Sequence, residues 1–214
     1  MKLSDLLFPR FCVICGKRIY DGSLCAQCAE KLNTLKKPDV RNIQNNECSA
    51  VGFYLFEYKS DEVKKVIFSL KQDNNSDLFI YVSKLLCELC DRIGFDGECV
   101  ITNVPRKSVN VRKYGYDQSE RLAKLIAKTS CKGIRYERLL KRRGFSDEQK
   151  NVGSAEKRRQ NVHGKFKAAK KDIPGNVLLL DDVVTTGSSA LECISALKAA
   201  RSDVNIKCVF LASR

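Results

Sequence analysis

The sequence predicts an α/β fold, with a mostly parallel sheet flanked by helices and a small metal-binding segment in front of it. From residue 48 onward, short runs rich in β-branched and aromatic residues alternate with segments whose apolar residues recur at helical spacing. Strands that alternate with helices favour a parallel sheet, because each parallel connection must cross over the sheet. Two Cys-x-x-Cys pairs stand earlier, so we expect a metal-binding segment at 1–36, a polar linker at 37–47 and the main domain at 48–214.

The opening segment carries four cysteines in two pairs that are separated by nine residues, Cys12-Val-Ile-Cys15 and Cys25-Ala-Gln-Cys28. Each pair can present two thiolates to one tetrahedral ion, which predicts a structural Zn²⁺. Gly16 suits a tight turn whose N–H groups point at sulfur. Redox-active dithiols are the alternative. Four protein ligands leave no open coordination position, so we expect no catalytic role for this metal.

The elements of the main domain are expected in the following order. Val51 to Tyr58 is rich in aromatic and β-branched residues and is predicted to be a strand. Helices are expected at 61–70 and 77–92, and Cys87-Glu-Leu-Cys90 in the second is interpreted as packing residues, not as a second metal pair. The remaining expected elements are strand Cys99–Val104, helix Ser119–Lys128, strand Ile134–Leu140, strand Val177–Leu180, helix Ser189–Ala200 and strand Val204–Leu211.

Positive charge is concentrated in one third of the chain. Val104 to Lys171 holds 21 Lys or Arg against 6 Asp or Glu, and so accounts for the whole net charge of +14. This predicts a polyanionic partner, either a phosphate-rich small molecule or a nucleic-acid backbone, with a basic surface kept for solubility as the alternative. Within it, Lys141 to Phe166 is expected to be a long loop with one short helix at Ser154–Gln160. Candidates for a lid or for DNA contacts there are Arg142, Arg143, Arg158 and Arg159.

Val177 to Ser189 joins an apolar strand to two aspartates and a hydroxyl-rich turn. Ligands of open parallel sheets bind beyond the carboxyl ends of strands, and a small turn that leads into a helix can hold a phosphate. The residues expected to hold it are Thr185, Thr186, Gly187, Ser188 and Ser189. Asp181 and Asp182 would repel a phosphate, so we expect them to bind sugar hydroxyls or a hydrated Mg²⁺. A ribose 5-phosphate meets both demands. The alternatives for the aspartates are a Walker-B-like pair or a helix cap, although the chain lacks both G-x4-G-K-[ST] and G-x-G-x-x-G.

This thirteen-residue stretch resembles the phosphoribosyl pyrophosphate (PRPP) signature of type I phosphoribosyltransferases. The resemblance implies that Asp181 and Asp182 bind the ribose 2- and 3-hydroxyls, that residues 185–189 hold the 5-phosphate, and that Mg²⁺ bridges pyrophosphate and ribose. It also implies that the loop after strand 99–104 holds pyrophosphate, through Arg106 and Lys107.

Further segments resemble the ComF/GntX family over nearly the whole chain. They are Leu-Phe-Pro-Arg-Phe-Cys with its four cysteines, Arg112-Lys-Tyr-Gly-Tyr-Asp-Gln118, and Gln149, Arg158, Asn161 and Phe166. The chain departs from the family at Tyr114, where arginine is common. The resemblance implies a type I phosphoribosyltransferase-like domain with a four-cysteine zinc segment, a role in bacterial DNA uptake and a competence helicase as partner.

Three functions are therefore compared. The first is a Mg²⁺-dependent phosphoribosyltransferase whose acceptor and catalytic base the sequence does not name. The second is a module that handles single-stranded DNA and whose PRPP site is regulatory or vestigial, and the third is a scaffold for other uptake proteins. No run reaches the roughly 18 apolar residues of a membrane span and no leader is recognisable, so we expect a cytoplasmic protein.

Overall fold

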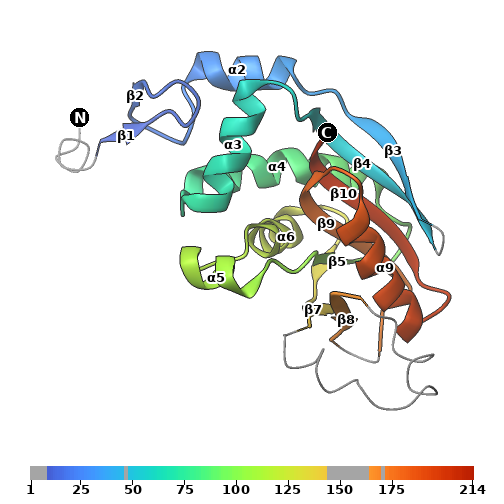
Figure 1. The fold of residues 1–214 in the computed structure, drawn as a ribbon. Helices are drawn as coiled ribbons and strands as arrows, with labels where there is room; N and C mark the ends of the chain where they lie inside the picture. The colour runs from blue at the N-terminus through green and yellow to red at the C-terminus, as the bar shows by residue number, and fades with distance from the viewer. Residues whose placement is uncertain (1–8, 46–47, 144–163, 170–171) are drawn as a thin grey trace.

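The computed structural model describes residues 9–45, 48–143, 164–169 and 172–214, and Figure 1 shows their arrangement. The elements, in chain order, are β1 Arg10–Phe11, β2 Arg18–Ile19, α2 Ala26–Thr34, β3 Asp39–Gln44, β4 Ser49–Glu57, α3 Asp61–Gln72, α4 Ser76–Ile93, β5 Val100–Asn103, α5 Ser108–Tyr114, α6 Gln118–Thr129, β6 Arg135–Tyr136, β7 Leu140–Arg142, β8 Phe166–Ala168, β9 Asn176–Val184, α9 Ser188–Ala200 and β10 Asn205–Ser213.

A six-stranded sheet forms the centre of the molecule, in the order β3-β4-β10-β9-β5-β6. Neighbouring strands from β4 to β6 pair in parallel, while β3 runs antiparallel to β4. A sheet with helices on both faces has strands that are apolar throughout, and residues 177–180 of β9 are fully buried. The predicted fold class, a mostly parallel sheet flanked by helices, is confirmed.

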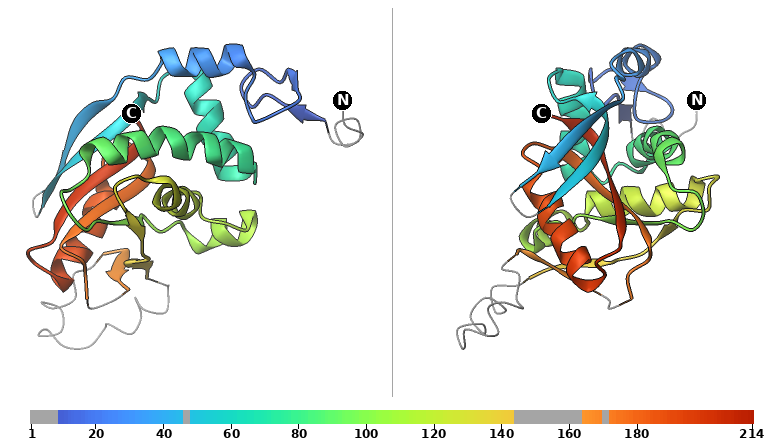
Figure 2. Two further views of the ribbon diagram at one scale, coloured as in Figure 1. Left: turned by 180° about the vertical axis from the view of Figure 1, so that it is seen from behind. Right: turned by 90° about the vertical axis from the view of Figure 1, so that its right-hand side faces the viewer.

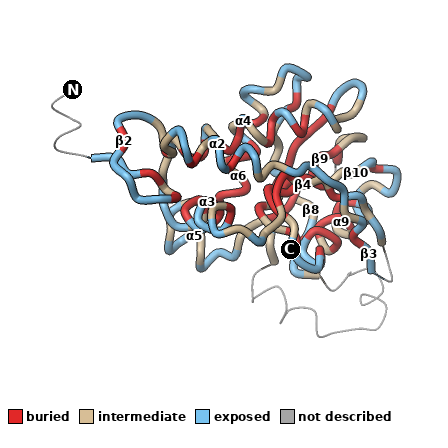
Figure 3. Tube along the Cα trace, turned by 90° about the horizontal axis from the view of Figure 1, so that it is seen from above, coloured by how far each residue is buried: buried red, intermediate tan, exposed pale blue. Residues whose placement is uncertain are grey.

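Helices α3, α4 and α6 cover one face of the sheet and α9 covers the other (Figure 2). Alternate side chains of β9 pack on opposite faces of the sheet. Leu178 and Leu180 belong to the buried cluster under α3, α4 and α6, and Val177 and Leu179 belong to the one under α9. Figure 3 shows the buried residues following the central strands and the helix faces turned toward them. The carboxyl ends of the parallel strands thus share one edge, where the predicted ligand residues stand.

The cysteine-bearing segment packs directly against α3. Cys12, Ile14 and Leu32 belong to the same buried cluster as the apolar residues of α3, α4 and α6. The Lys65 ammonium of α3 donates a hydrogen bond to the carbonyl of Ile14, at 2.6 Å. One hydrophobic core therefore runs from the cysteine segment into the sheet.

Three local predictions are wrong in detail. Residues 37–47 are not a linker throughout, because Asp39–Gln44 form the edge strand β3, in which Ile43 is the buried residue. Strand β9 does not end at Leu180 but continues to Val184, since its pairing with β10 extends through the aspartates. The single strand expected at Ile134–Leu140 is replaced by β6 and β7, which belong to different sheets.

The helices predicted at 61–70, 77–92, 119–128 and 189–200 are confirmed as α3, α4, α6 and α9, with ends that shift by a residue or two. Cys87 and Cys90 are buried in α4, as expected for packing residues. The short helix predicted at 154–160 lies outside the described residues. None of the helices in the described part of the chain has the length and apolar composition needed to span a bilayer.

Candidate functional site

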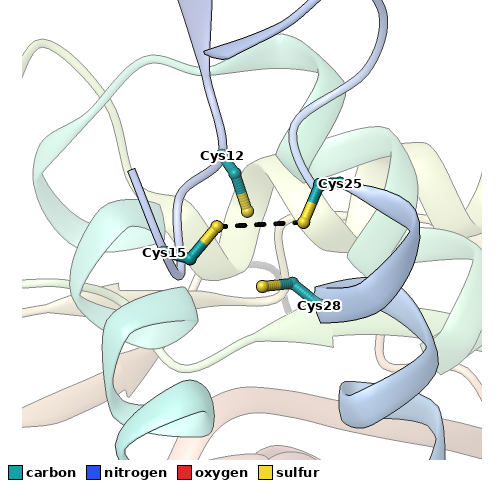
Figure 4. A group of neighbouring side chains, drawn as sticks. All are labelled: Cys12, Cys15, Cys25 and Cys28. Atoms are coloured by element: carbon teal, nitrogen blue, oxygen red, sulfur yellow. Dashed lines mark hydrogen bonds between the residues drawn. The ribbon is translucent and has the colours of Figure 1, made fainter. Parts of the chain in front are cut away.

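The four cysteines of the opening segment meet at one point (Figure 4). Their Sγ atoms all lie within 4.8 Å of one another, and those of Cys15 and Cys25 are 3.8 Å apart. A tetrahedron with Zn–S bonds of about 2.3 Å has edges of about 3.8 Å, whereas a disulfide brings its sulfurs to about 2.05 Å. The donor set therefore fits a structural Zn²⁺, and the prediction of these four ligands agrees with the geometry.

Local backbone structure prepares these sulfurs for a metal. Gly16 has φ +73°, and its N–H donates to the carbonyl of Cys12 at 2.8 Å, which closes the turn after the first pair. Burial by itself would raise the pKa of Cys12, but backbone N–H groups of Cys15, Cys25 and Ile14 donate to its sulfur and lower the pKa to about 6. Burial raises the pKa of Cys28. Because a metal binds the thiolates, loading the site releases protons.

The hydroxyl-rich turn forms the junction between β9 and α9. Gly187 caps the helix in the left-handed region, at φ +77°, and a Cβ there would lie 2.8 Å from Cγ2 of Ile43. Thr186 and Ser188 contact each other through their hydroxyls at 2.7 Å. Gly187 supplies no side-chain cap to α9, although the Thr186 hydroxyl accepts a long hydrogen bond from the N–H of Ser188, at 3.4 Å. The N-terminus of a helix is nonetheless a favourable place for an anion. Thr185, Thr186, Ser188 and Ser189 are exposed, which leaves the turn open to a ligand.

The two aspartates lie at the carboxyl end of β9, and each uses one carboxylate oxygen for a structural contact. Oδ1 of Asp181 accepts from the Ser119 hydroxyl at 3.2 Å and from the N–H of Asp182 at 2.9 Å. Oδ2 of Asp182 accepts from the Gln118 amide at 2.9 Å and forms an ion pair with Lys71 at 3.1 Å. Among the described residues these contacts involve one oxygen of each carboxylate, and the second oxygen is the candidate to bind a ligand.

The aspartates differ in their ionisation. Burial, with a smaller contribution from the charge of neighbouring Asp182, raises the pKa of Asp181 to about 8. A ligand that places cations or hydroxyl donors beside Asp181 would favour its ionised form.

Arg106 and Lys107 follow β5, but they have different surroundings. The Arg106 guanidinium donates to the carbonyls of Lys71 at 2.9 Å and Tyr116 at 3.3 Å, and it lies 4.9 Å from the ring centre of Tyr114. Lys107 is exposed at the start of α5. Arg106 thus ties α3 to the turn before α6, while Lys107 is the more accessible cation of the two.

A cavity of about 430 Å³ lies beside this loop. Its walls include Arg106, Arg112, Lys141 and Arg142. Arg142 lies over the Phe166 ring, 5.0 Å from its centre, and its guanidinium is 3.5 Å from the carbonyl of Pro105. The structure therefore brings the strand-end loop and the first predicted lid residue to one cavity.

Of the other residues predicted to belong to a lid, only Arg143 lies in the described part of the chain. Arg143 is partly buried, and its N–H donates to the carbonyl of Lys165 at 2.9 Å. Arg158 and Arg159 lie outside the described residues.

Sequence reasoning did not assign the residues that hold the aspartates. Lys71 lies in the last turn of α3, and Gln118 and Ser119 begin α6. Each of these residues is 62 or more positions from its aspartate in the chain. Asp117 does indicate where α6 begins, because an Asp before a helix is a typical N-cap. Its side chain accepts from the N–H groups of Ser119 and Glu120. Nothing local in the sequence, however, indicates which side chains reach β9.

Comparison with protein families finds a match at the start of the chain. Residues 3–52 match the family described as the double zinc ribbon domain. This range contains five cysteines and no histidine. Cys48, the fifth, lies instead beside Ser195, at 3.5 Å. The matched range therefore carries one four-cysteine ligand set.

Comparison with curated protein sequences finds no match. Among solved structures, the allosteric regulatory enzyme of purine biosynthesis matches at 20% identity and TM-score 0.47, over 69% of this chain and 30% of that one. A glutamine PRPP amidotransferase from B. subtilis, complexed with ADP and GMP, matches at 19% identity and TM-score 0.47, over the same shares. An adenine phosphoribosyltransferase matches at 16% identity and TM-score 0.38, over 87% of this chain and 89% of that one. The chain thus corresponds to less than a third of the length of the first two.

Proposed function

We propose that the carboxyl end of β9 binds PRPP or another ribose 5-phosphate together with Mg²⁺. The observation that carries this proposal is the arrangement of Asp181 and Asp182, each with one oxygen held by the described residues, next to the N-terminus of α9 and its exposed hydroxyls. Two carboxylate oxygens suit a sugar diol or a hydrated Mg²⁺, and the helix terminus with its hydroxyls suits a phosphate. The resemblance of residues 177–189 to the PRPP signature supports the same assignment.

Each part of the proposed site has a separate task. Residues 185–189 hold the 5-phosphate, and the aspartates bind the ribose hydroxyls. Lys107 faces solvent and can approach pyrophosphate, whereas Arg106 shapes the loop through its contacts to two carbonyls. When bound, Mg²⁺ would neutralise charge on the pyrophosphate. If an acceptor forms a bond to ribose C1 as the bond to pyrophosphate breaks, Lys107 and Mg²⁺ would stabilise the departing pyrophosphate.

Calorimetric titration of the zinc-loaded protein with PRPP in the presence of Mg²⁺ tests the site. We expect binding by the wild type and by the control Asp96→Asn, which alters an exposed carboxylate of the loop before β5. We expect loss of binding in the double variant Asp181→Asn/Asp182→Asn. Equal binding by wild type and double variant, or no binding by the folded wild type, would refute the proposal.

A phosphoribosyltransferase reaction is proposed as the activity of this site. The measurement is release of pyrophosphate from PRPP in the presence of candidate acceptors, beginning with nucleobases. Release that depends on both acceptor and Mg²⁺ would support turnover, whereas binding without release would favour a regulatory site.

A second proposed function is the binding of single-stranded DNA, within a role in DNA uptake in the cytoplasm. The cavity lined by Arg112, Lys141 and Arg142, in the segment that carries the net charge, favours it. Binding should weaken steeply with salt, with a log–log slope of about −0.7 for each phosphate contacted. Affinity that is indifferent to salt would count against it, as would affinity unchanged when Arg142, Arg143, Arg158 and Arg159 become alanine.

The division of the chain and its protein partner are also proposals. We propose that residues 1–36 serve to bind zinc and residues 48–214 to bind the ribose phosphate. A competence helicase would be the partner of a scaffold function, and a pulldown in the absence of nucleic acid tests this directly. Recovery of the helicase only when DNA is present would indicate that DNA bridges the two proteins.

A further inference from the structure

Lys71 stands at the last turn of α3 and reaches Asp182 across the sheet edge. Its ammonium lies 3.1 Å from Oδ2 of Asp182, whose side chain is 8% exposed, while that of Lys71 is 38% exposed. Gln118 donates to the same oxygen from the other side, at 2.9 Å. Two donors on one oxygen fix the plane of the carboxylate and turn Oδ1 away from both.

The position of Lys71 is itself fixed by contacts at both ends of α3. Near the first turn, Glu62 pairs with Lys31 of α2 at 2.5 Å. At the last turn, the carbonyl of Lys71 accepts from Arg106 at 2.9 Å, and that of Leu70 accepts from the Tyr116 hydroxyl at 2.9 Å. The ammonium therefore projects from a backbone that is held from both sides, which lets it hold Asp182 in turn.

Two adjacent carboxylates at a binding site need partners that fix their orientation. When both are ionised, Asp181 and Asp182 repel each other, and without a fixed partner Asp182 would rotate away from its neighbour or toward solvent. A sugar diol, in contrast, requires the two free oxygens in a defined relation, since hydrogen bonds weaken steeply with misalignment.

We propose that Lys71 is a positioning residue of the ribose-phosphate site, which acts by holding Asp182 so that Oδ1 faces the ligand. This rests on the function proposed above and adds a residue that neither the PRPP-like stretch nor the strand-end loop contains. Lys71 contributes through Asp182 and does not contact the ligand.

The test is a double-mutant cycle on PRPP binding in Mg²⁺, measured by calorimetry on zinc-loaded protein. Replacement of a residue that orients a ligand group typically weakens affinity roughly tenfold or more, so Lys71→Met should raise Kd about tenfold. Lys71→Arg, which keeps a donor, should recover most of the affinity. Lys64→Met is the matched control, because Lys64 lies on the same helix and pairs only with Asp61, at 3.4 Å, among the described residues.

The cycle separates positioning from direct contact. If Lys71 acts through Asp182, Lys71→Met should have little further effect in an Asp182→Asn background. A full tenfold effect in that background would overturn the proposal in favour of direct ligand contact. Unchanged affinity in Lys71→Met, with Asp182→Asn weakened, would overturn the positioning role alone. If neither wild type nor variants bind PRPP, the proposed function fails and this inference with it.

Discussion

Gly187 makes the turn between β9 and α9 sensitive to a single methyl group. Its φ of +77° lies in the left-handed region, where a residue with a Cβ costs about 1–2 kcal/mol. In Gly187→Ala the new Cβ would also lie 2.8 Å and 2.9 Å from Cγ2 and Cβ of Ile43, far inside van der Waals contact. Overpacking of this kind costs about 1–3 kcal/mol, so we expect Gly187→Ala to lower the free energy of unfolding by about 2–5 kcal/mol.

Gly133→Ala separates the two contributions. Gly133 has φ +67°, and no atom of the described residues outside its chain neighbours lies within 4 Å of the point where an alanine Cβ would stand. Only the backbone cost applies there, about 1–2 kcal/mol. Urea unfolding of the zinc-loaded proteins measures both values, and PRPP titration shows whether the turn has moved. A loss in Gly187→Ala no larger than that in Gly133→Ala would refute the close contact between β3 and the turn.

Three further predictions concern the metal, the aspartates and the strand-end loop. Cys12→Ser should abolish stoichiometric zinc binding, measured by metal analysis after dialysis. The control is Cys131→Ser, which changes an exposed cysteine outside the cluster and should keep the zinc. Zinc retained by Cys12→Ser would contradict the four-thiolate site. Because burial and the charge of Asp182 raise the pKa of Asp181 from the usual 3.8 to about 8, its contribution to stability is fully present below about pH 3.8 and lost as the pH rises through 8. Asp181→Asn should flatten this part of the profile of Tm against pH, and an unchanged slope would argue against a buried carboxylate. Arg106→Met should lower the free energy of unfolding by about 1.5–3 kcal/mol, because two carbonyls lose a charged donor. Lys107→Met should change the stability little. Equal effects of the two substitutions in thermal unfolding would contradict this difference.

The sequence predicts the central architecture well, because buried parallel strands carry continuous apolar runs. Residues 177–180 and 208–211 are of this kind, and both lie in strands of the sheet. The edge strand β3 has Ile43 as its buried residue, so its polar composition resembles that of a linker. Strand identity at an edge depends on pairing with β4, which no local pattern reveals.

The candidate site was predictable where one stretch of chain carries it. Residues 181–189 hold the aspartates and the turn together, and spacing alone predicts the four cysteines. The resemblance implies that Arg106 holds pyrophosphate. The sequence does not reveal that its guanidinium donates to the carbonyls of Lys71 and Tyr116. Lys71 could not be recognised at all, since its role depends on where α3 ends relative to β9.

The hydrophobic cluster shared by the cysteine segment and the sheet couples metal binding to the stability of the sheet. A ligand that binds only the folded chain stabilises it by mass action, by about 2.7 kcal/mol at a hundredfold excess over Kd. Domains of this size are stable by only about 5–15 kcal/mol, so that increment is a large share of the total. Because Cys12, Ile14 and Leu32 belong to the core cluster beneath α3, a metal that stabilises the cysteine segment also stabilises that core. Loss of zinc would thus lower the stability of the core on which the β9 turn rests, although the metal lies outside that turn.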